Sequence, residues 1–300
     1  MAWPEVLVAG YAGVDLVWTA ASPPGPHRTA LLTGPVEPRP RFGGCAPIVA
    51  MLLARQGHRV GLVSWLGDDA CGRAYRAKLE AAGVDTQATV FAPGQATPRS
   101  LLIYDPDGGV TCCYHPSGSA DQKLDARGQA QLAHARMLAL TVGPCALTAA
   151  LLAQRPAGSR VAWGVKADAN AYPVGLRRQL LEEADVITMN RDELAFVAEA
   201  LPGGMSASDD DARLACMRRA TSAAMAVTAG RAGVRVAWPD GDVQLPASPI
   251  EAENPTGAGD AFFAGFLGAL LRDLDPVESA RAGMAEAVGF LRTNGAIHSL

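Results

Sequence analysis

A glycine-rich turn with one acidic residue precedes a long apolar segment near residue 260. Residues Asn254 to Asp260 read Asn-Pro-Thr-Gly-Ala-Gly-Asp, and an apolar segment runs on from Ala261 to Leu271. This pattern predicts a helix whose first amides have no internal partner and lie at the positive end of the helix dipole. Because glycine has no side chain, a phosphate can approach these amides closely. Gly257, Ala258 and Gly259 are therefore a candidate anion site.

Asp260 falls in the first turn of the expected helix, beside the place where the phosphate would lie. A carboxylate repels a phosphate, but it can accept the proton of a hydroxyl that attacks one. Phosphoryl transfer requires mainly alignment and charge stabilisation, so one carboxylate beside free amides meets its demands. The pattern predicts phosphoryl transfer to a hydroxyl, with Asp260 as the base. The structural alternative is an aspartate that stabilises a helix end by about 0.3–1 kcal/mol.

Short β-branched runs alternate with helical patterns along most of the chain. The alternation predicts a doubly wound, mostly parallel sheet in an α/β fold. The expected strands cover residues 6–8, 60–63, 137–142, 161–165, 186–189 and 225–228, and expected helices cover 47–55, 72–82, 191–200 and 211–221.

Two stretches interrupt this alternation and contain strand patterns without a helix. Residues 14–42 form the first, and residues 90–114 form the second around an Asp-Pro-Asp-Gly-Gly turn at 105–109. We expect antiparallel pieces that build a small β lid. The predicted α/β core then comprises 1–13, 43–89 and 115–300. The alternative is two unrelated surface excursions.

The composition is typical of a globular protein and argues against some kinds of partner. The 300 residues are 49% hydrophobic and 19% charged, with a net charge of −4 and no basic block, which argues against a nucleic-acid partner. The apolar segment after Asp260 is about half of the ~20 residues that a membrane span needs, so no membrane association is expected. Six cysteines form no Cys-x-x-Cys pair, and the first 25 residues carry no secretory signal pattern. We expect reduced thiols and a cytoplasmic location.

Several motifs in order along nearly the whole chain resemble the ribokinase-like, or pfkB, carbohydrate kinases. The motif at 256–260 is similar to the C-terminal signature of that family. The family's other motifs are matched by Gly43-Gly44, Leu66 to Asp69, Ala82 to Thr86, Asn190 to Leu194 and Val227 to Gly233. The resemblance implies a Rossmann-like domain with a small β lid and an ATP-dependent carbohydrate kinase.

The resemblance also implies roles for particular residues. Asp260 would be the catalytic base, and Gly257, Ala258 and Gly259 the anion hole. Asn190 and Glu193 would organise Mg²⁺ and the ATP phosphates through water; the structural alternative is a helix cap at Asn190 and an ordinary exposed Glu193. The residues implied to border the nucleotide are Thr228, Gly230, Gly233 and Asn294.

Two further sets of residues follow from the resemblance. Asn254 and Ser299 match positions that contribute to a monovalent cation site, which leaves K⁺ use open. Asp15, Gly43 and Gly44 match positions that hold substrate hydroxyls, with a turn residue as the alternative for Asp15. Arg99 in the lid would contact a charged substituent of the substrate or remain solvated.

Ile48 departs from the family pattern, because it stands where the family usually has an asparagine that points at the substrate. An alkyl side chain cannot make those hydrogen bonds, so the substrate stays open. The three alternatives are a kinase of a sugar or sugar derivative, a nucleoside kinase that needs an apolar or aromatic slot for a base, and a non-catalytic ligand-binding protein. A small molecule is the expected partner. A homodimer through the exposed lid face, frequent in such kinases, is also left open.

Overall fold

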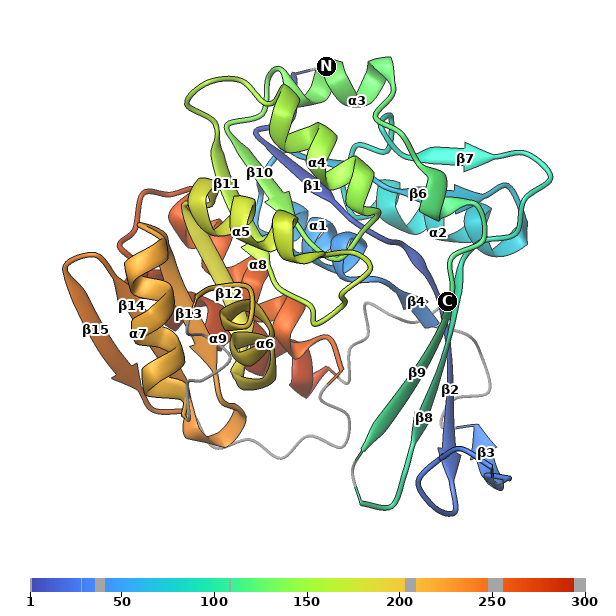
Figure 1. The fold of residues 1–300 in the computed structure, drawn as a ribbon. Coiled ribbons are helices and arrows are strands. Elements are labelled where there is room, and N and C mark those ends of the chain that lie inside the picture. The colour runs from blue at the N-terminus through green and yellow to red at the C-terminus, as the bar shows by residue number, and fades with distance from the viewer. Residues whose placement is uncertain are drawn as a thin grey trace.

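The main body of the molecule is an eight-stranded sheet. The structure is a computed structural model that describes residues 2–27, 29–35, 41–107, 109–202, 209–247 and 256–293. The strand order is β15-β14-β13-β12-β11-β10-β1-β5, parallel from β13 to β5 and antiparallel at the β14 and β15 edge (Figure 1). These strands are β1 (Val6–Ala9), β5 (Val60–Val63), β10 (Met137–Leu140), β11 (Arg160–Gly164), β12 (Val186–Asn190), β13 (Ala224–Thr228), β14 (Val234–Trp238) and β15 (Gly241–Leu245).

Helices cover both faces of this sheet. Neighbouring strand residues such as Val6 and Leu7 belong to two different apolar clusters, because successive side chains point to opposite faces. The first cluster includes residues of α1, α2, α8 and α9, and the second includes residues of α3 to α7. The helices are α1 (Cys45–Arg55), α2 (Ala70–Ala81), α3 (Ala126–Leu132), α4 (Cys145–Gln154), α5 (Val174–Glu183), α6 (Arg191–Ala198), α7 (Asp210–Ala220), α8 (Ala258–Leu270) and α9 (Pro276–Arg292).

Helix α8 is the apolar helix expected after Asp260. Its residues from Ala261 to Leu270 are all buried, because α8 packs against α1, α9 and the sheet. Of the helices that the structure describes, none combines the length and apolar content that crossing a membrane requires.

A second sheet extends away from the main body (Figure 1). Strands β8 and β9 form the expected antiparallel pair around the turn at 105–109, and β2 pairs antiparallel with β3 and β4. Strands β2 and β8 pair in parallel, which the sequence did not predict. The strands of this second sheet are β2 (Gly13–Ala20), β3 (Leu32–Pro35), β4 (Arg41–Gly43), β8 (Arg99–Tyr104) and β9 (Val110–His115).

Residues 90–92 do not join this second sheet. They form β7 (Val90–Ala92), which pairs with β6 (Trp65–Gly67) in a separate two-stranded sheet. The predicted lid range of 90–114 therefore divides between two sheets. The division of the chain into a core and a lid remains a prediction.

Candidate active site

The start of α8 is formed by a glycine-rich turn. Gly257 is the N-cap residue and has φ 86° and ψ −7°, a left-handed conformation that glycine adopts without strain. No side chain of the described residues caps this helix end. Gly259 is exposed, and a Cβ placed there would meet no described heavy atom within 4 Å. The first turn of α8 can therefore accept an anion at its amides.

The carboxylate of Asp260 interacts with groups from two other parts of the chain. The thiol of Cys45, the first residue of α1, donates a hydrogen bond to it, and Lys166 acts on it electrostatically. Burial raises the pKa of Asp260 above its ordinary value, while Cys45 and Lys166 lower it in part. Since a raised pKa means a higher proton affinity, this carboxylate is suited to receive a proton.

Asp15 on β2 lies within electrostatic reach of Asp260. The pKa of Asp15 is raised to about 6, because burial and the charge of Asp260 raise it by more than a hydrogen bond from Ser100 and the charge of Arg41 lower it. Asp15 is the register neighbour of Arg41 on β4 and of Ser100 on β8. The structure thus brings together the predicted base and the predicted substrate ligand.

Gly43 allows Asp15 to take this position. A Cβ on Gly43 would lie 2.1 Å from Oδ2 of Asp15, closer than any real contact. The carbonyl of Gly43 accepts a hydrogen bond of 2.8 Å from the buried hydroxyl of Tyr75, which holds the strand in place. Gly44 follows as the N-cap of α1, with φ 98°. Gly43 therefore lies directly beside Asp15, and Gly44 follows it at the start of α1.

Ile48 and Arg99 differ in their relation to the site. Ile48 is 3% exposed and belongs to the first apolar cluster, so it packs in the core. Arg99 is the register neighbour of Val14, and its exposed side chain acts on Asp69, whose pKa it helps to lower. Because residues alternate along a strand, Arg99 points to the opposite face of the sheet from Asp15 and Ser100. The structure does not bring Arg99 together with the other predicted substrate ligands.

The carboxyl ends of β12 and β13 hold the predicted nucleotide residues. The Asn190 side chain accepts a hydrogen bond of 2.9 Å from the amide of Glu193, and the Glu193 carboxylate accepts one of 2.8 Å from the amide of Asn190. Asn190 thus caps α6, as the structural alternative held, but Glu193 is only 8% exposed, contrary to that alternative. Burial raises the pKa of Glu193 to about 7, although the Asn190 amide and Lys166 lower it.

Thr228, Gly230 and Gly233 follow on the neighbouring strand. Thr228 pairs in register with Asn190, and its hydroxyl donates to the carbonyl of Met189 at 3.3 Å. Gly230 and Gly233 have φ of 53° and 91° in the turn that leads into β14. The remaining predictions, Asn254, Asn294 and Ser299, lie outside the described residues.

The Glu193 carboxylate, beside the carboxyl end of β12, fits a cation that is held through water. Within the described residues, no group of three or more His, Cys, Asp or Glu side chains could hold a metal ion directly. One oxygen of Glu193 accepts the Asn190 amide, which orients the carboxylate. Mg²⁺ keeps several waters and binds through one or two carboxylates together with substrate phosphates, so a single oriented carboxylate meets its requirement.

Comparison with known proteins identifies the family. The model of the "pfkB family carbohydrate kinase" matches residues 24–300. This chain belongs to the pfkB family. A fructokinase of Klebsiella pneumoniae is 32% identical over 98% of this chain and 92% of its own length, and a nucleoside kinase of Methanothermobacter thermautotrophicus is 25% identical over 97% and 90%. The solved ribokinase of Thermotoga maritima covers 98% of this chain and 95% of its own, with a TM-score of 0.81 at 20% identity.

These findings confirm two predictions made from the motifs. The protein is a carbohydrate kinase of the pfkB family, and its fold is ribokinase-like. The fold explains why the site lies where it does. In doubly wound sheets ligands bind at the carboxyl ends of the strands, and Asn190, Thr228 and Lys166 all lie at or just beyond those ends.

The structure adds site residues of this pfkB kinase that the motifs did not point to. Arg41, Cys45 and Ser100 act on Asp15 or Asp260, and Lys166 acts on both Asp260 and Glu193. Only the position of Cys45 directly after Gly43-Gly44, and of Lys166 directly after an expected strand, offered a signal. Arg41 and Ser100 reach Asp15 through strand pairing, which the sequence does not specify.

Tyr114 lies within electrostatic reach of Asp15 and forms a ring pair with Tyr11. The rings of Tyr11 and Tyr114 are 5.2 Å apart between centroids and tilted by 51°. Tyr114 pairs in register with Ser100, so it shares the face of Asp15, and it is 38% exposed. The pfkB kinase therefore offers an accessible aromatic surface next to its predicted substrate carboxylate.

The second sheet also contacts the start of α8. The hydroxyl of Tyr104, at the end of β8, hydrogen-bonds the hydroxyl of Thr256, which precedes Gly257. This contact joins the second sheet to the predicted anion hole.

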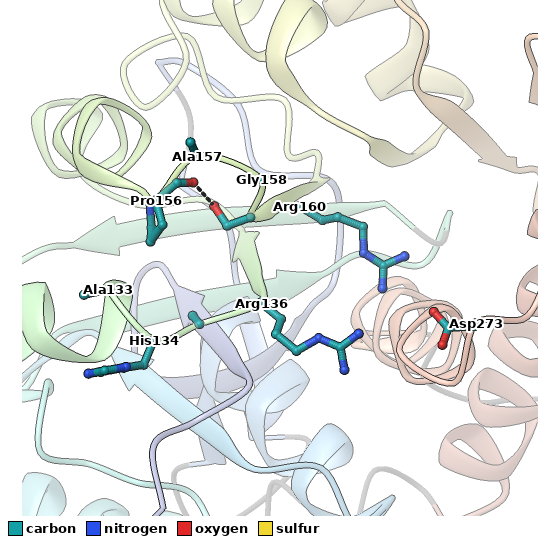
Figure 2. Close-up of a pocket in the computed structure, with 10 residues that line it drawn as sticks. Ala133, His134, Arg136, Pro156, Ala157, Gly158, Arg160 and Asp273 are labelled. Atoms are coloured by element: carbon teal, nitrogen blue, oxygen red, sulfur yellow. Dashed lines mark hydrogen bonds between the residues drawn. The ribbon is translucent and has the colours of Figure 1, made fainter.

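A surface hollow of about 440 Å³ lies away from this site, where β10 and β11 begin (Figure 2). Figure 2 shows the side chains of Arg136 and Arg160 extending toward the side of the hollow where Asp273 lies. It occupies the amino-terminal edge of the sheet, opposite to Asp260. This hollow is therefore not part of the candidate site.

Proposed function

We propose that this protein transfers the γ-phosphoryl group of ATP to a hydroxyl of a sugar or sugar-like molecule. The observation that carries the proposal is the position of Asp260, beside the uncapped amides of α8 and within electrostatic reach of Asp15. A group that receives a proton, a group that binds hydroxyls and an anion site thus converge. A protein that only binds its ligand would have no use for this combination.

In the proposed mechanism, the protein aligns the hydroxyl and stabilises charge. Asp15 accepts hydrogen bonds from substrate hydroxyls and so orients the acceptor, while Ser100 and Arg41 hold Asp15. Asp260 takes the proton of the attacking hydroxyl, which its raised pKa favours. The amides of Gly257, Ala258 and Gly259 face the negative charge on the transferred group.

The donor side of the site would hold ATP. Asn190 and Glu193 would organise the phosphates and a hydrated Mg²⁺, and Thr228, Gly230 and Gly233 would border the nucleotide, with Asn294 beside the adenine. When bound, Mg²⁺ neutralises phosphate charge. A K⁺ requirement through Asn254 and Ser299 stays a prediction.

A nucleoside is the second candidate substrate, and the tyrosine pair favours it. Every nucleobase has a π face that stacks on an aromatic ring, and Tyr114 presents an exposed ring on the same face as Asp15. A free sugar would use Asp15 alone, whereas a nucleoside would use Asp15 for its ribose and Tyr114 for its base. Among the relatives, one is named fructokinase and another nucleoside kinase, so both candidates have precedent.

The substitution Tyr114→Ala distinguishes these candidates. If a nucleoside is the substrate, loss of one stacking contact costs about 1–3 kcal/mol, and the KM for the nucleoside should rise about 5- to 150-fold. Tyr114→Phe keeps the ring and should leave this KM nearly unchanged. Steady-state kinetics with the preferred acceptor gives the answer. Equal KM values for the wild type and Tyr114→Ala would remove the base-stacking role.

The proposed function is tested with the purified protein, ATP, Mg²⁺ and a panel of free sugars and nucleosides, with and without K⁺. At least one acceptor should raise ADP formation well above the acceptor-free rate and yield a phosphorylated product. Binding of ATP without turnover of any acceptor in the panel would contradict the proposal. A thermal-shift screen narrows the panel first, because a ligand at 100 times its Kd stabilises a protein by about 2.7 kcal/mol.

A further inference from the structure

Lys166 is a lysine within electrostatic reach of both Asp260 and Glu193. The chain has only three lysines, Lys78, Lys123 and Lys166, against 23 arginines. Lys166 lies two residues beyond β11, at the same edge of the sheet as Asn190 and Thr228. The preceding residue is held by a hydrogen bond of 2.9 Å from the amide of Val165 to the carbonyl of Thr188, and the carbonyl of Lys166 accepts one of 2.8 Å from the amide of Asp168.

The surroundings of Lys166 keep its ammonium group charged. Partial burial lowers the pKa of Lys166, but Cys45, Glu193, Asp260 and Cys112 raise it, and the net result lies above the ordinary value. The same charge lowers the pKa values of Glu193 and Asp260. Lys166 therefore acts on both the predicted base and the predicted nucleotide residue.

No carboxylate in the described part of the chain forms an ion pair with Lys166 within 4 Å. Other cations of the protein do pair: Arg155 lies 2.5 Å from Glu183, and Arg235 lies 2.8 Å from Asp242. Residue Lys166 as a whole is exposed, although its neighbours partly enclose the ammonium group, so the ammonium can contact a ligand. An exposed cation that acts on two carboxylates and forms no ion pair with either within 4 Å leaves room for an anion.

We propose that Lys166 is a catalytic residue that contacts the phosphoryl group during its transfer from ATP to the hydroxyl. This role rests on the proposed function and deepens it. The anion lies between the groups that Lys166 acts on: Glu193 on the donor side and Asp260 on the acceptor side. A cation there stabilises the charge spread over the transferred oxygens, in addition to the amides of α8.

A structural role makes a different prediction. Suppose that Lys166 only offsets the repulsion between Asp260 and Glu193. Its neutral replacement would then change the stability of the free protein. A reactive ATP derivative bound to the wild type would label Lys166 no more than the other lysines. The tests below therefore include one readout of position and one of turnover.

The first test labels the protein with an acyl phosphate of ATP. A lysine beside the γ-phosphate attacks the carbonyl carbon of this reagent, an amide bond forms, the bond from carbon to the phosphate oxygen breaks, and ATP leaves; the amine's proton goes to the solvent. Mass spectrometry should find the label on Lys166 in preference to Lys78 and Lys123, and excess ATP should suppress it. A protein that binds ATP but carries no label on Lys166 would overturn the inference.

The second test compares the substitutions Lys166→Met and Lys166→Arg. Loss of one donor that stabilises a transition state costs about 10²- to 10³-fold in kcat, so Lys166→Met should show this loss with little change in ATP affinity. Lys166→Arg should recover part of it, since it restores the charge. Lys123→Met is the matched control, because Lys123 is exposed and no described site residue interacts with it.

The two proposals fail in different ways. If the wild type phosphorylates an acceptor and Lys166→Met does so at the wild-type rate, the role of Lys166 is wrong and the proposed function stands. If the wild type phosphorylates no acceptor, the proposed function is wrong, and the role of Lys166 falls with it whether or not the ATP reagent labels this residue.

Discussion

Asp260→Asn is expected to lower kcat by at least ~10²-fold while the affinity for ATP stays nearly the same. Asparagine has the shape of aspartate, but it cannot accept the proton of the attacking hydroxyl. Because Asp260 lies beside the amides and not among the predicted nucleotide residues, ATP binding should persist. A coupled assay of ADP formation gives kcat, and calorimetric titration with a non-hydrolysable ATP analogue gives the affinity.

The control for this prediction addresses the structural alternative, in which Asp260 only stabilises the start of a helix. Asp211 lies in the first turn of α7, and its side chain is 80% exposed. Asp211→Asn therefore removes a comparable helix-dipole interaction away from the site, and its kcat should match that of the wild type. Wild-type turnover in Asp260→Asn would exclude Asp260 as the base.

The stability of Asp260→Asn provides a second control. Burial raises the pKa of Asp260, which means that the folded protein disfavours its charged form. A neutral replacement of the same shape should leave the melting temperature unchanged or raise it above the wild-type value at neutral pH. Loss of turnover in a protein that is at least as stable as the wild type cannot come from unfolding.

Local patterns carried most of the fold prediction. The six expected strands are the six parallel strands of the main sheet, because each is a short apolar run buried on both faces. The pairing of β2 with β8 was not predicted, since 85 residues separate their register neighbours Val14 and Arg99. Local turn signals determine a hairpin such as β8 and β9, but no local signal determines a pairing between distant strands.

The residues of the candidate site also fall into those that local motifs predict and those that depend on pairing between distant strands. Three of the site residues, Asp260, Gly43 and Asn190, belong to local motifs. The residues of such a motif share one turn or one helix start, so residues that are close in the sequence are also close in the fold. Arg41 and Ser100 reach Asp15 from two strands that a one-residue change of register would turn away. Arg99 illustrates this dependence on register, because it neighbours Ser100 in sequence and yet lies on the opposite face.

Asp15→Asn is expected to impair substrate binding and to stabilise the protein at the same time. A hydrogen bond to a charged group contributes about 1.5–3 kcal/mol, so the KM for the hydroxyl substrate should rise about 10- to 150-fold, while the KM for ATP should stay constant. The amide keeps the size of the side chain beside Gly43, which a larger residue would displace. Steady-state kinetics with each substrate varied in turn measures both constants.

The stability effect of Asp15→Asn depends on pH, and its sign follows from the pKa. Asp15 has a pKa of about 6 in the folded protein against an ordinary value of 3.8, so the folded state binds the proton more tightly than the unfolded chain. The contribution of Asp15 to wild-type stability therefore falls as pH rises from about 4 to about 6 and stays lower above that, by up to about 3 kcal/mol. Asparagine does not titrate and avoids this loss.

Urea unfolding of the wild type and Asp15→Asn at pH 4 and pH 8 tests the argument. The two proteins should differ little at pH 4, where Asp15 is largely protonated in the folded state, and Asp15→Asn should be more stable at pH 8. Asp211→Asn serves again as the control, because its exposed carboxylate has no comparable burial. A variant that binds substrate poorly and is also less stable at pH 8 would contradict the argument. It would show that the Asp15 carboxylate stabilises the second sheet, whereas we expect its buried charge to destabilise the fold.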